Sequence, residues 1–125
     1  MLNSEQLLHY IWRNRLYNTD SLITENGVKV EVLDPGLSNE DAGPDFFSSK
    51  IKARGKVWAG NVEIHRASSD WVRHGHHKDK AYNSVILHLA EDIDTEIVTE
   101  NGQKVSQCRI EVSEKLRKSA EYLIN

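Results

Sequence analysis

A short, almost uninterrupted apolar run, Val85-Ile86-Leu87-His88-Leu89, constrains the fold of this chain more than any other stretch. Such a run is typical of a strand that is buried on both faces, as in the middle of a sheet that is covered on both sides. The chain has 125 residues, which suits one domain with one hydrophobic core. We therefore expect a single domain over residues 1–125 with one central sheet.

The remaining elements are predicted from the spacing of apolar residues and from turn residues. In chain order we expect a helix over residues 4–17, strands over 28–32, 44–53 and 57–66, a loop with a helix over 67–83, the apolar strand, a hairpin over 96–110 and a helix capped by Ser113. The order α-β-β-β-α-β, followed by a hairpin and a helix, predicts an α/β or α+β fold with a mixed central sheet.

Several positions within these elements carry sharper expectations. Leu16 continues the apolar stripe of the first helix, and Ser68 or Ser69 is placed to cap the helix within 67–83. Asn101-Gly102 is typical of a tight hairpin turn. The last helix carries apolar residues at helical spacing, namely Leu116, Ala120, Leu123 and Ile124.

The charge of the chain is uneven along its length. Lys and Arg total 16 and Asp and Glu total 19, and the net charge of −3 argues against a protein that coats DNA. Residues 50–80, however, carry eight basic and three acidic side chains, a local charge of +5, and five of the six histidines lie between residues 65 and 88. Such asymmetry is typical of a chain with an anionic partner.

A single cysteine, Cys108, excludes an internal disulfide framework and a cysteine-based zinc site. The first residues lack the basic and apolar parts of a signal peptide, and no stretch has the length of a membrane span. We therefore expect a soluble, cytoplasmic protein without a membrane partner.

The strand over 57–66 holds the most informative polar residues. Side chains alternate between the faces of a strand, so Trp58, Val62 and Ile64 are expected in the core and Glu63 and His65 on the opposite face. One interpretation is the exposed polar face of an edge strand.

A hairpin between 44–53 and 57–66 gives these polar residues a second interpretation. It brings Asp45, at the start of one strand, close to Glu63 and His65, near the end of the next. Two carboxylates and an imidazole that converge there suit a divalent-metal site with a proton-transfer group.

A second cluster of polar residues follows in the segment 68–79. His74, His76, His77 and Asp79 have side chains that suit Zn²⁺, although adjacent ligands rarely fit tetrahedral geometry without a distant fourth. The alternatives are a solvated turn, or a role beside Asp45 and Glu63 in which Asp70, His74 or His76 orients water or contacts phosphate.

Three further features bear on a phosphate-binding site. Lys50 and Lys52 share a strand face, which suits a phosphate backbone and equally suits a solvated face or a lysine-protected edge. Arg66 adds a further cation beside the polar pair. His88 is expected as a satisfied core histidine, or as a group behind the site if its face points there.

Pro44-Asp45 and Glu63-Ile64-His65, within the order α-β-β-β-α-β, resemble the PD-(D/E)XK nuclease superfamily, which has a restriction-endonuclease-like fold. The resemblance implies that Asp45 and Glu63 hold Mg²⁺ or Mn²⁺ and that nucleic acid is the substrate. His65 stands where the superfamily has a lysine that helps to activate water. Some members use a carboxylate of the first helix as an extra ligand, and Glu5 takes that position here, although an acidic residue also suits a helix N-terminus.

A wider set of motifs resembles an uncharacterised family of bacterial proteins, a domain of unknown function. The motifs are GPDFF, GNVEIH, SSDW, HGHH and KDKAYNSVILHL, and the resemblance spans most of residues 4–90. It implies that this chain is the amino-terminal part of a longer protein, and it implies no particular activity.

Three functions remain open from the sequence. The first is a metal-dependent phosphodiesterase, with Asp45 and Glu63 as ligands of Mg²⁺ or Mn²⁺ and His65 as general base or as a hydrogen-bond donor to the phosphate. The second is a catalytically inactive module of the same fold that binds nucleic acid or a protein. The third is a transition-metal site, with Zn²⁺ as its candidate ion, built from histidines of residues 65–79.

Overall fold

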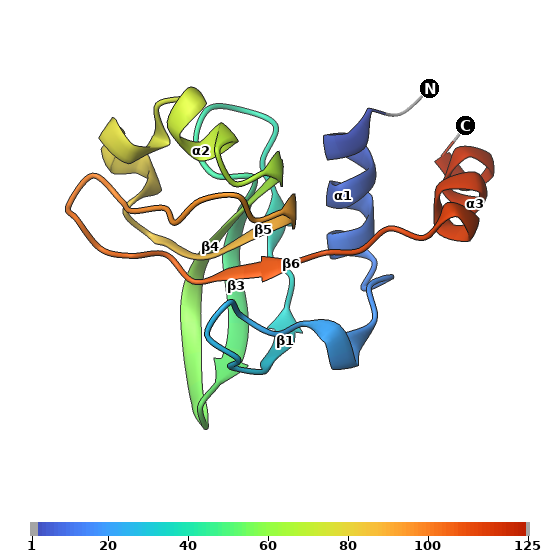
Figure 1. The fold of residues 1–125 in the computed structure, drawn as a ribbon, viewed down its shortest axis with the longest axis horizontal. Helices are drawn as coiled ribbons and strands as arrows, with labels where there is room; N and C mark the ends of the chain where they lie inside the picture. Colours follow the sequence, from blue (N-terminus) through green and yellow to red (C-terminus); the bar gives the residue numbers. More distant parts are fainter. Residues whose placement is uncertain (1–2, 125) are drawn as a thin grey trace.

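A curled, mixed sheet forms the centre of the computed structural model, which describes residues 3–124 (Figure 1). The helical elements are α1 (Ser4–Arg13), η1 (Thr19–Ser21), α2 (Asp70–Arg73), η2 (His76–Lys78), η3 (Lys80–Tyr82) and α3 (Glu114–Ile124). The strands are β1 (Val30–Asp34), β2 (Leu37–Ser38), β3 (Phe46–Ala53), β4 (Lys56–Ala67), β5 (Val85–Asp92) and β6 (Gln107–Arg109). Together they form one small α+β domain, as predicted.

The sheet combines an antiparallel half and a parallel half. Its order is β1-β3-β4-β5-β6, and the short β2 pairs with β3. β3 is antiparallel to both β1 and β4, whereas β5 is parallel to β4 and β6 is parallel to β5. The chain order α1, β1, β3, β4, α2, β5 matches the predicted α-β-β-β-α-β order, to which β2 is an addition.

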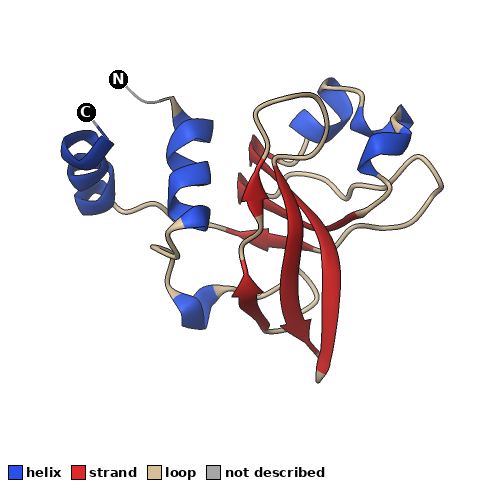
Figure 2. Ribbon diagram, turned by 180° about the vertical axis from the view of Figure 1, so that it is seen from behind, coloured by secondary structure: helices blue, strands red, loops and turns tan. Residues whose placement is uncertain are grey.

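The two faces of the sheet are covered by different parts of the chain (Figure 2). On one face, the buried stripe of α1 packs against alternating residues of β4 and β5 and forms the main core, which includes Leu8, Trp12, Ile64, Leu87 and Leu89. On the other face, α2, η3 and the loop after β5 contribute a second cluster, made of Trp71, Tyr82, Val85, Ile97 and Val105. β5 is thus buried on both sides, as its apolar run predicts.

The first helix is shorter than predicted. It begins with the expected capping box of Asn3 and Gln6, but it ends at Arg13 because Arg15 adopts a left-handed conformation with φ of 56°. The Arg15 and Leu16 N–H groups then bond back to carbonyls of the last helical turn, a Schellman-type ending. Leu16 leaves the apolar stripe as a result and is 40% exposed.

The hairpin of β3 and β4 extends beyond β5, on the side of the sheet where β1 pairs with β3. Arg54 and Gly55 both have positive φ and form its two-residue turn, at the predicted place. β5 pairs with β4 only from Asn61 onward, so the first residues of β4 have one neighbouring strand instead of two. The prediction that Trp58 lies in the core is wrong for this reason, and Trp58 is 49% exposed.

A bulge in β3 changes which of its side chains face the core at the start of the strand. The pairing with β4 shifts between Phe46 and Ser49, and Ser48 takes a left-handed φ of 58°. The Ser48 N–H donates to Asn61 Oδ1, which holds the extra residue in place. Phe46 therefore packs fully buried in the core, and Asp45 directly precedes it.

The segments on either side of β5 differ in detail from the prediction. The helix of residues 67–83 is a single turn, α2, followed by η2 and η3. Ser69 is its N-cap residue, but its side chain bonds to Asp94 instead of capping the helix. The predicted hairpin after β5 is reduced to one bridge between Val98 and Lys104, because residues 107–109 pair with β5 as β6.

The last helix begins where it was predicted. The Ser113 hydroxyl accepts a hydrogen bond from the Leu116 N–H, and Leu116 packs against the main core. The side chains of Ala120, Leu123 and Ile124 lie outside the described residues. Over the described part of the chain, no helix combines the length and the apolar character that a membrane crossing requires.

Candidate functional site

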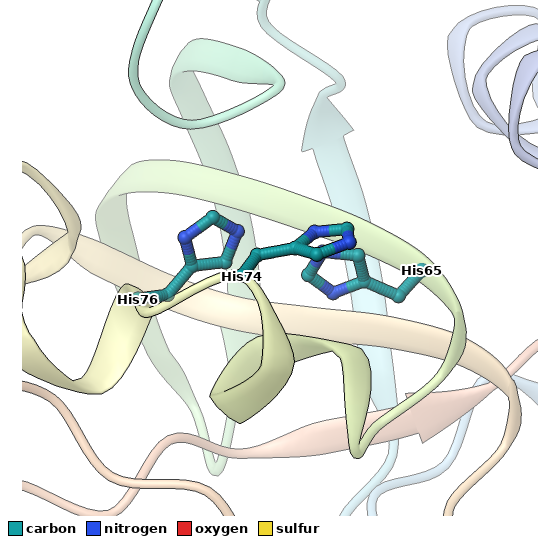
Figure 3. A group of neighbouring side chains, drawn as sticks. All are labelled: His65, His74 and His76. Atoms are coloured by element: carbon teal, nitrogen blue, oxygen red, sulfur yellow. The ribbon is translucent and has the colours of Figure 1, made fainter.

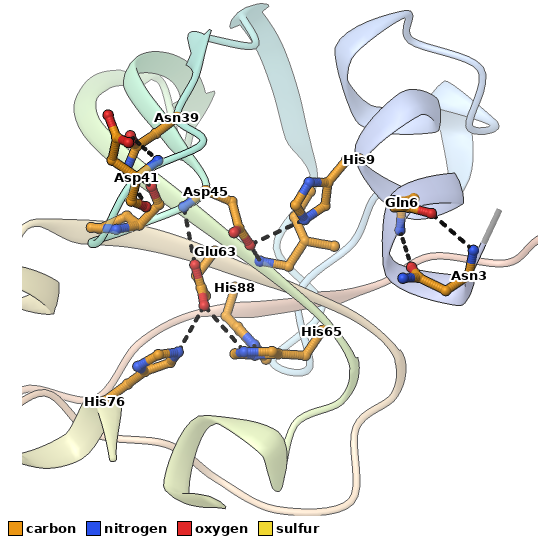
Figure 4. A network of polar contacts seen from close by, with 12 residues as sticks. Asn3, Gln6, His9, Asn39, Asp41, Asp45, Glu63, His65, His76 and His88 are labelled. Atoms are coloured by element: carbon orange, nitrogen blue, oxygen red, sulfur yellow. Dashed lines mark hydrogen bonds and ion pairs between the residues drawn. The ribbon is translucent and has the colours of Figure 1, made fainter. Parts of the chain in front are cut away.

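Asp45 and Glu63 meet where β3 begins, as the hairpin geometry predicts. The Asp45 N–H donates to Glu63 Oε1 at 3.0 Å, and the Ile64 N–H donates to Asp45 Oδ2 at 2.9 Å (Figure 4). The Glu63 carboxylate is therefore held by the backbone of Asp45, and the Asp45 carboxylate is held by the backbone of the residue after Glu63. Glu63 is 3% exposed, so it does not lie on the open face of an edge strand.

The surroundings move the pKa values of the two carboxyl groups in opposite directions. Burial raises the pKa of Asp45, and the negative charge of Glu63 raises it further, while His9 lowers it. Burial also acts to raise the pKa of Glu63, but the contacts with His65 and His76 outweigh it and bring the pKa to about 2. Glu63 is thus a buried carboxylate that stays ionised.

The second oxygen of Glu63 faces two imidazoles. Glu63 Oε2 lies 3.1 Å from His65 Nε2 and 2.8 Å from His76 Nε2. The His76 ring stacks on Tyr82, with ring centres 3.8 Å apart, which fixes its orientation. Among the described residues, His76 Nε2 is buried and has no hydrogen-bond partner other than this contact with Glu63.

His65, His74 and His76 form a compact group of three imidazoles (Figure 3). One ligating nitrogen from each lies within 4.8 Å of the others. Ligand atoms around a tetrahedral Zn²⁺ lie about 3.4 Å apart, given Zn–N bonds of about 2.0–2.1 Å. His65 and His76 are buried and His74 is exposed, so rotation of His74 is the movement by which the group can close on an ion.

His65 is held from behind by a row of side chains across three strands. The register places Glu63 of β4 beside His88 of β5, and His88 beside Gln107 of β6. His65 Nδ1 and His88 Nε2 are 2.7 Å apart, and His88 Nδ1 lies 2.9 Å from Gln107 Oε1. Burial lowers the pKa of His88 to about 4, and the neighbouring His65 lowers it as well. His88 is therefore both a satisfied core histidine and a group behind the site.

His9 of α1 is a site residue that the sequence analysis missed. Its Nε2 lies 3.3 Å from Asp45 Oδ2, and its ring packs edge-on against Phe46. Burial lowers the pKa of His9, but Asp45 and, more weakly, Glu5 raise it above its usual value. The signal in the sequence is the spacing of Glu5 and His9, which puts both on one side of a helix whose opposite side is apolar.

Gln107 was also missed. It is 1% exposed and follows a loop, so no periodic pattern marks it. The Gln107 N–H donates to Glu25 Oε2, and its side-chain amide donates to the Thr95 carbonyl.

The remaining acidic and histidine candidates have other partners or positions. Asp70 forms an ion pair of 2.7 Å with Arg73 in α2. Asp79 caps η3 by accepting the Ala81 N–H. His77 is half-buried and lies outside the group of three imidazoles. Glu5 lies in the first turn of α1, one turn before His9.

The basic candidates lie on different sides of the sheet. Lys50 pairs with Ala59 and Lys52 with Val57, which places both exposed lysines on the Glu63 side of the sheet by strand alternation. Ala59 and Glu63 are about 13 Å apart along the strand at 3.3 Å per residue. Arg66 lies two residues after Ile64 on β4 and therefore projects from the same face, the α1 side, away from Glu63.

Cys108 is fully buried, and burial raises its pKa to about 12, so it lacks the character of a reactive thiolate.

Comparison with known proteins gives a family but no activity. No curated protein and no solved structure matches the chain significantly. A family model described as "Protein of unknown function (DUF2851)" matches residues 5–125, which extends the resemblance seen in the motifs of residues 4–90 through the last helix. The chain therefore belongs to the DUF2851 family.

Proposed function

We propose that this domain is a metal-dependent hydrolase of phosphodiester bonds in nucleic acid. Its metal centre consists of Glu63, His65, His74 and His76, with Asp45 beside it. The observation that carries the proposal is the position of Glu63 Oε2, 3.1 Å from His65 Nε2 and 2.8 Å from His76 Nε2. A carboxylate and imidazoles that converge in this way form a common ligand set for divalent ions.

The residues fit a transition-metal ion better than Mg²⁺. Mg²⁺ prefers oxygen ligands and retains several waters, whereas imidazole suits Zn²⁺ and other transition metals. The buried His76 Nε2, which has no hydrogen-bond partner among the described residues, would gain one as a ligand. We therefore propose Mn²⁺ or Zn²⁺ as the ion. Both ring nitrogens of His65 already face partners, Glu63 and His88, so His65 is placed to act as a ligand and not as a free general base.

A bound divalent ion would polarise the phosphate and lower the pKa of a bound water. The protein side chains have separate tasks around it. Asp45 is partly exposed and lies next to Glu63, so it can orient a water or the phosphate at the mouth of the site. His9 lies 3.3 Å from Asp45 Oδ2 and can hold or transfer a proton there.

The distribution of charge supports a nucleic-acid substrate. Lys50 and Lys52 are exposed on the Glu63 side of the sheet, along the hairpin that extends away from the site. Arg73 of α2 precedes His74 and is 71% exposed, although its ion pair with Asp70 offsets part of its charge. These cations suit contacts with a phosphate backbone, which position a strand without reading its sequence.

Cleavage assays test the proposal. The protein is mixed with Mn²⁺ or Zn²⁺ and with single-stranded and double-stranded DNA and RNA. We expect cleavage that requires the ion and falls below detection in Glu63→Gln and Asp45→Asn, whereas Glu111→Gln, an exposed control, cleaves like the wild type. Absence of cleavage on every substrate, or cleavage that survives both substitutions, would refute it.

The burial of the site favours a second candidate, a structural metal site without turnover. Glu63 is 3% exposed and His65 is 2% exposed, which suits a closed centre that stabilises the fold. In that case a chelator lowers the melting temperature of the metal-loaded protein, and no phosphodiester is cleaved. The same fold then serves as a binding module. Its affinity for DNA or RNA falls as the salt concentration rises and does not change when a chelator is added.

A further inference from the structure

We infer that His88 and Gln107 are positioning residues, which fix His65 in the form whose Nε2 is free to bind a metal ion. The inference rests on the proposed metal centre, and it identifies how strands β5 and β6 contribute to it. It is carried by a chain of hydrogen bonds across three neighbouring strands whose directions can be assigned one after another. Figure 4 shows the part of this chain formed by Glu63, His65 and His88.

The orientation of the Gln107 amide determines which group donates in the hydrogen bond between His88 and Gln107. Gln107 Nε2 donates to the Thr95 carbonyl at 2.8 Å, which leaves Gln107 Oε1 to face His88 Nδ1 at 2.9 Å. An amide oxygen can only accept a hydrogen bond. His88 Nδ1 must therefore carry a proton and donate it to Gln107.

The burial of His88 determines which group donates in the hydrogen bond between His65 and His88. His88 is fully buried, and its two ring nitrogens contact Gln107 and His65, with no carboxylate against either of them in the described part of the chain. A neutral imidazole carries one N–H, and in His88 that N–H is on Nδ1. His88 Nε2 is therefore an acceptor, and His65 Nδ1 donates to it at 2.7 Å.

The same reasoning then applies to His65. With its N–H on Nδ1, a neutral His65 has a lone pair on Nε2, and this nitrogen faces Glu63 Oε2 at 3.1 Å. Two acceptors at this distance repel each other unless a proton or a metal ion lies between or beside them. A divalent ion there would also meet His76 Nε2, 2.8 Å from the same oxygen.

Metal-binding histidines generally donate their other ring N–H to a group behind them, which sets the tautomer. A carboxylate often fills that position. Here a neutral imidazole and an amide fill it, so no further negative charge is added to a site that already contains Glu63 and Asp45. Trp71 packs edge-on against His88, with ring centres 5.6 Å apart, and helps to hold the ring in place.

Nuclear magnetic resonance of the wild-type protein tests the assignment without a substitution. Long-range ¹H–¹⁵N spectra of the histidine rings report which nitrogen is protonated. We expect His65 Nδ1 to carry a proton both without metal and with one equivalent of Zn²⁺, and His65 Nε2 to shift when Zn²⁺ is added. A His65 with its proton on Nε2 alone would overturn the inference.

Zn²⁺ affinity of two variants that leave every proposed ligand intact provides the second test. Gln107→Leu and His88→Leu should each weaken Zn²⁺ binding roughly 10- to 100-fold, as is common when the group behind a ligand is lost. His88→Gln retains an acceptor for His65 Nδ1 and should recover part of that loss. Gln103→Leu, at an exposed site in the preceding loop, is the matched control.

The outcomes separate this inference from the proposed function. Zn²⁺ binding with the expected His65 form, but without cleavage of any nucleic acid, would refute the hydrolase and support the positioning role. A folded Gln107→Leu protein that binds Zn²⁺ as tightly as the wild type would overturn the positioning role, whatever the activity. A wild-type protein that binds neither Zn²⁺ nor Mn²⁺ would overturn both.

Discussion

The two oxygens of Glu63 have separate partners, and this division organises the site at the scale of single residues. Oε1 accepts the Asp45 N–H, which attaches the carboxylate to the start of β3, and Oε2 faces His65 and His76. The carboxylate is thereby held in one orientation, with one oxygen directed at the imidazoles.

Glu63→Gln should weaken Zn²⁺ binding by more than the roughly 10- to 100-fold loss that is expected when a residue hydrogen-bonded to a metal ligand is replaced. An amide at this position carries no charge, and its NH₂ group would compete for the same imidazole nitrogens. Isothermal titration with Zn²⁺ measures the effect against Glu111→Gln. Equal affinities for the two variants would show that Glu63 is not a ligand.

His9→Gln should lower the rate of phosphodiester cleavage roughly 100-fold, the lower end of what a proton-transfer group contributes. Its affinity for Zn²⁺ should remain that of the wild type, because His9 lies against Asp45 and outside the group of three imidazoles. His77→Gln is the matched control. A His9→Gln protein with an unchanged rate would remove His9 from the reaction.

Strand register determines which of these residues the sequence could reveal. Alternation along one strand predicted that Glu63 and His65 share a face, and the hairpin turn predicted that Asp45 would meet them. The neighbours of His88 depend on the parallel register of β4, β5 and β6, which is set by long crossover segments and not by local pattern. Gln107 therefore carried no signal in the sequence.

The segment between β4 and β5 was only partly predictable for a related reason. Its polar composition indicated a loop and a helix, but the position of His76 depends on Gly75, whose φ of 76° turns the chain from α2 into η2. His74 and His76 thus lie on either side of a left-handed residue. Their convergence with His65 follows from that turn and from the stacking of His76 on Tyr82.

Gly75→Ala should destabilise the fold by about 1 kcal/mol, the cost of a side chain in the left-handed region. A Cβ at Gly75 would meet nothing within 4 Å, so the backbone alone accounts for the loss. Gly75→Asn should lose less, because Asn tolerates this conformation better. Urea denaturation of the three proteins measures the order, and an Ala variant as stable as the wild type would contradict it.

At the scale of the whole molecule, the buried row of polar groups makes stability depend on pH. The pKa of His88 is lowered from 6.5 to about 4 by burial, and the pKa of Glu63 is lowered from 4.5 to about 2 by its histidine contacts, which outweigh its burial. In both cases the unfolded chain binds the proton at a higher pH than the folded chain. These two groups therefore favour the folded state most above about pH 6.5, and their contribution is lost on acidification.

The metal-free protein should lose up to about 3 kcal/mol of unfolding free energy between pH 6.5 and pH 4 because of His88 alone. Glu63 adds a further loss between pH 4.5 and pH 2, as its carboxylate is protonated in the unfolded chain first. Denaturation at a series of pH values measures the curve. His88→Gln should lack the upper part of it, and a wild-type stability that stays constant from pH 6.5 to pH 4 would contradict this account.

X-ray absorption at the zinc edge, on protein loaded with one equivalent of Zn²⁺, tests the central claim most directly. The arrangement of Glu63, His65, His74 and His76 predicts three imidazole nitrogens and one carboxylate oxygen at about 2.0–2.2 Å from the metal, and the proposed hydrolase adds one water oxygen to this set. Asp45 and Cys108 should contribute no ligand to this set. A spectrum with oxygen ligands alone, or with sulfur, would contradict the proposed centre.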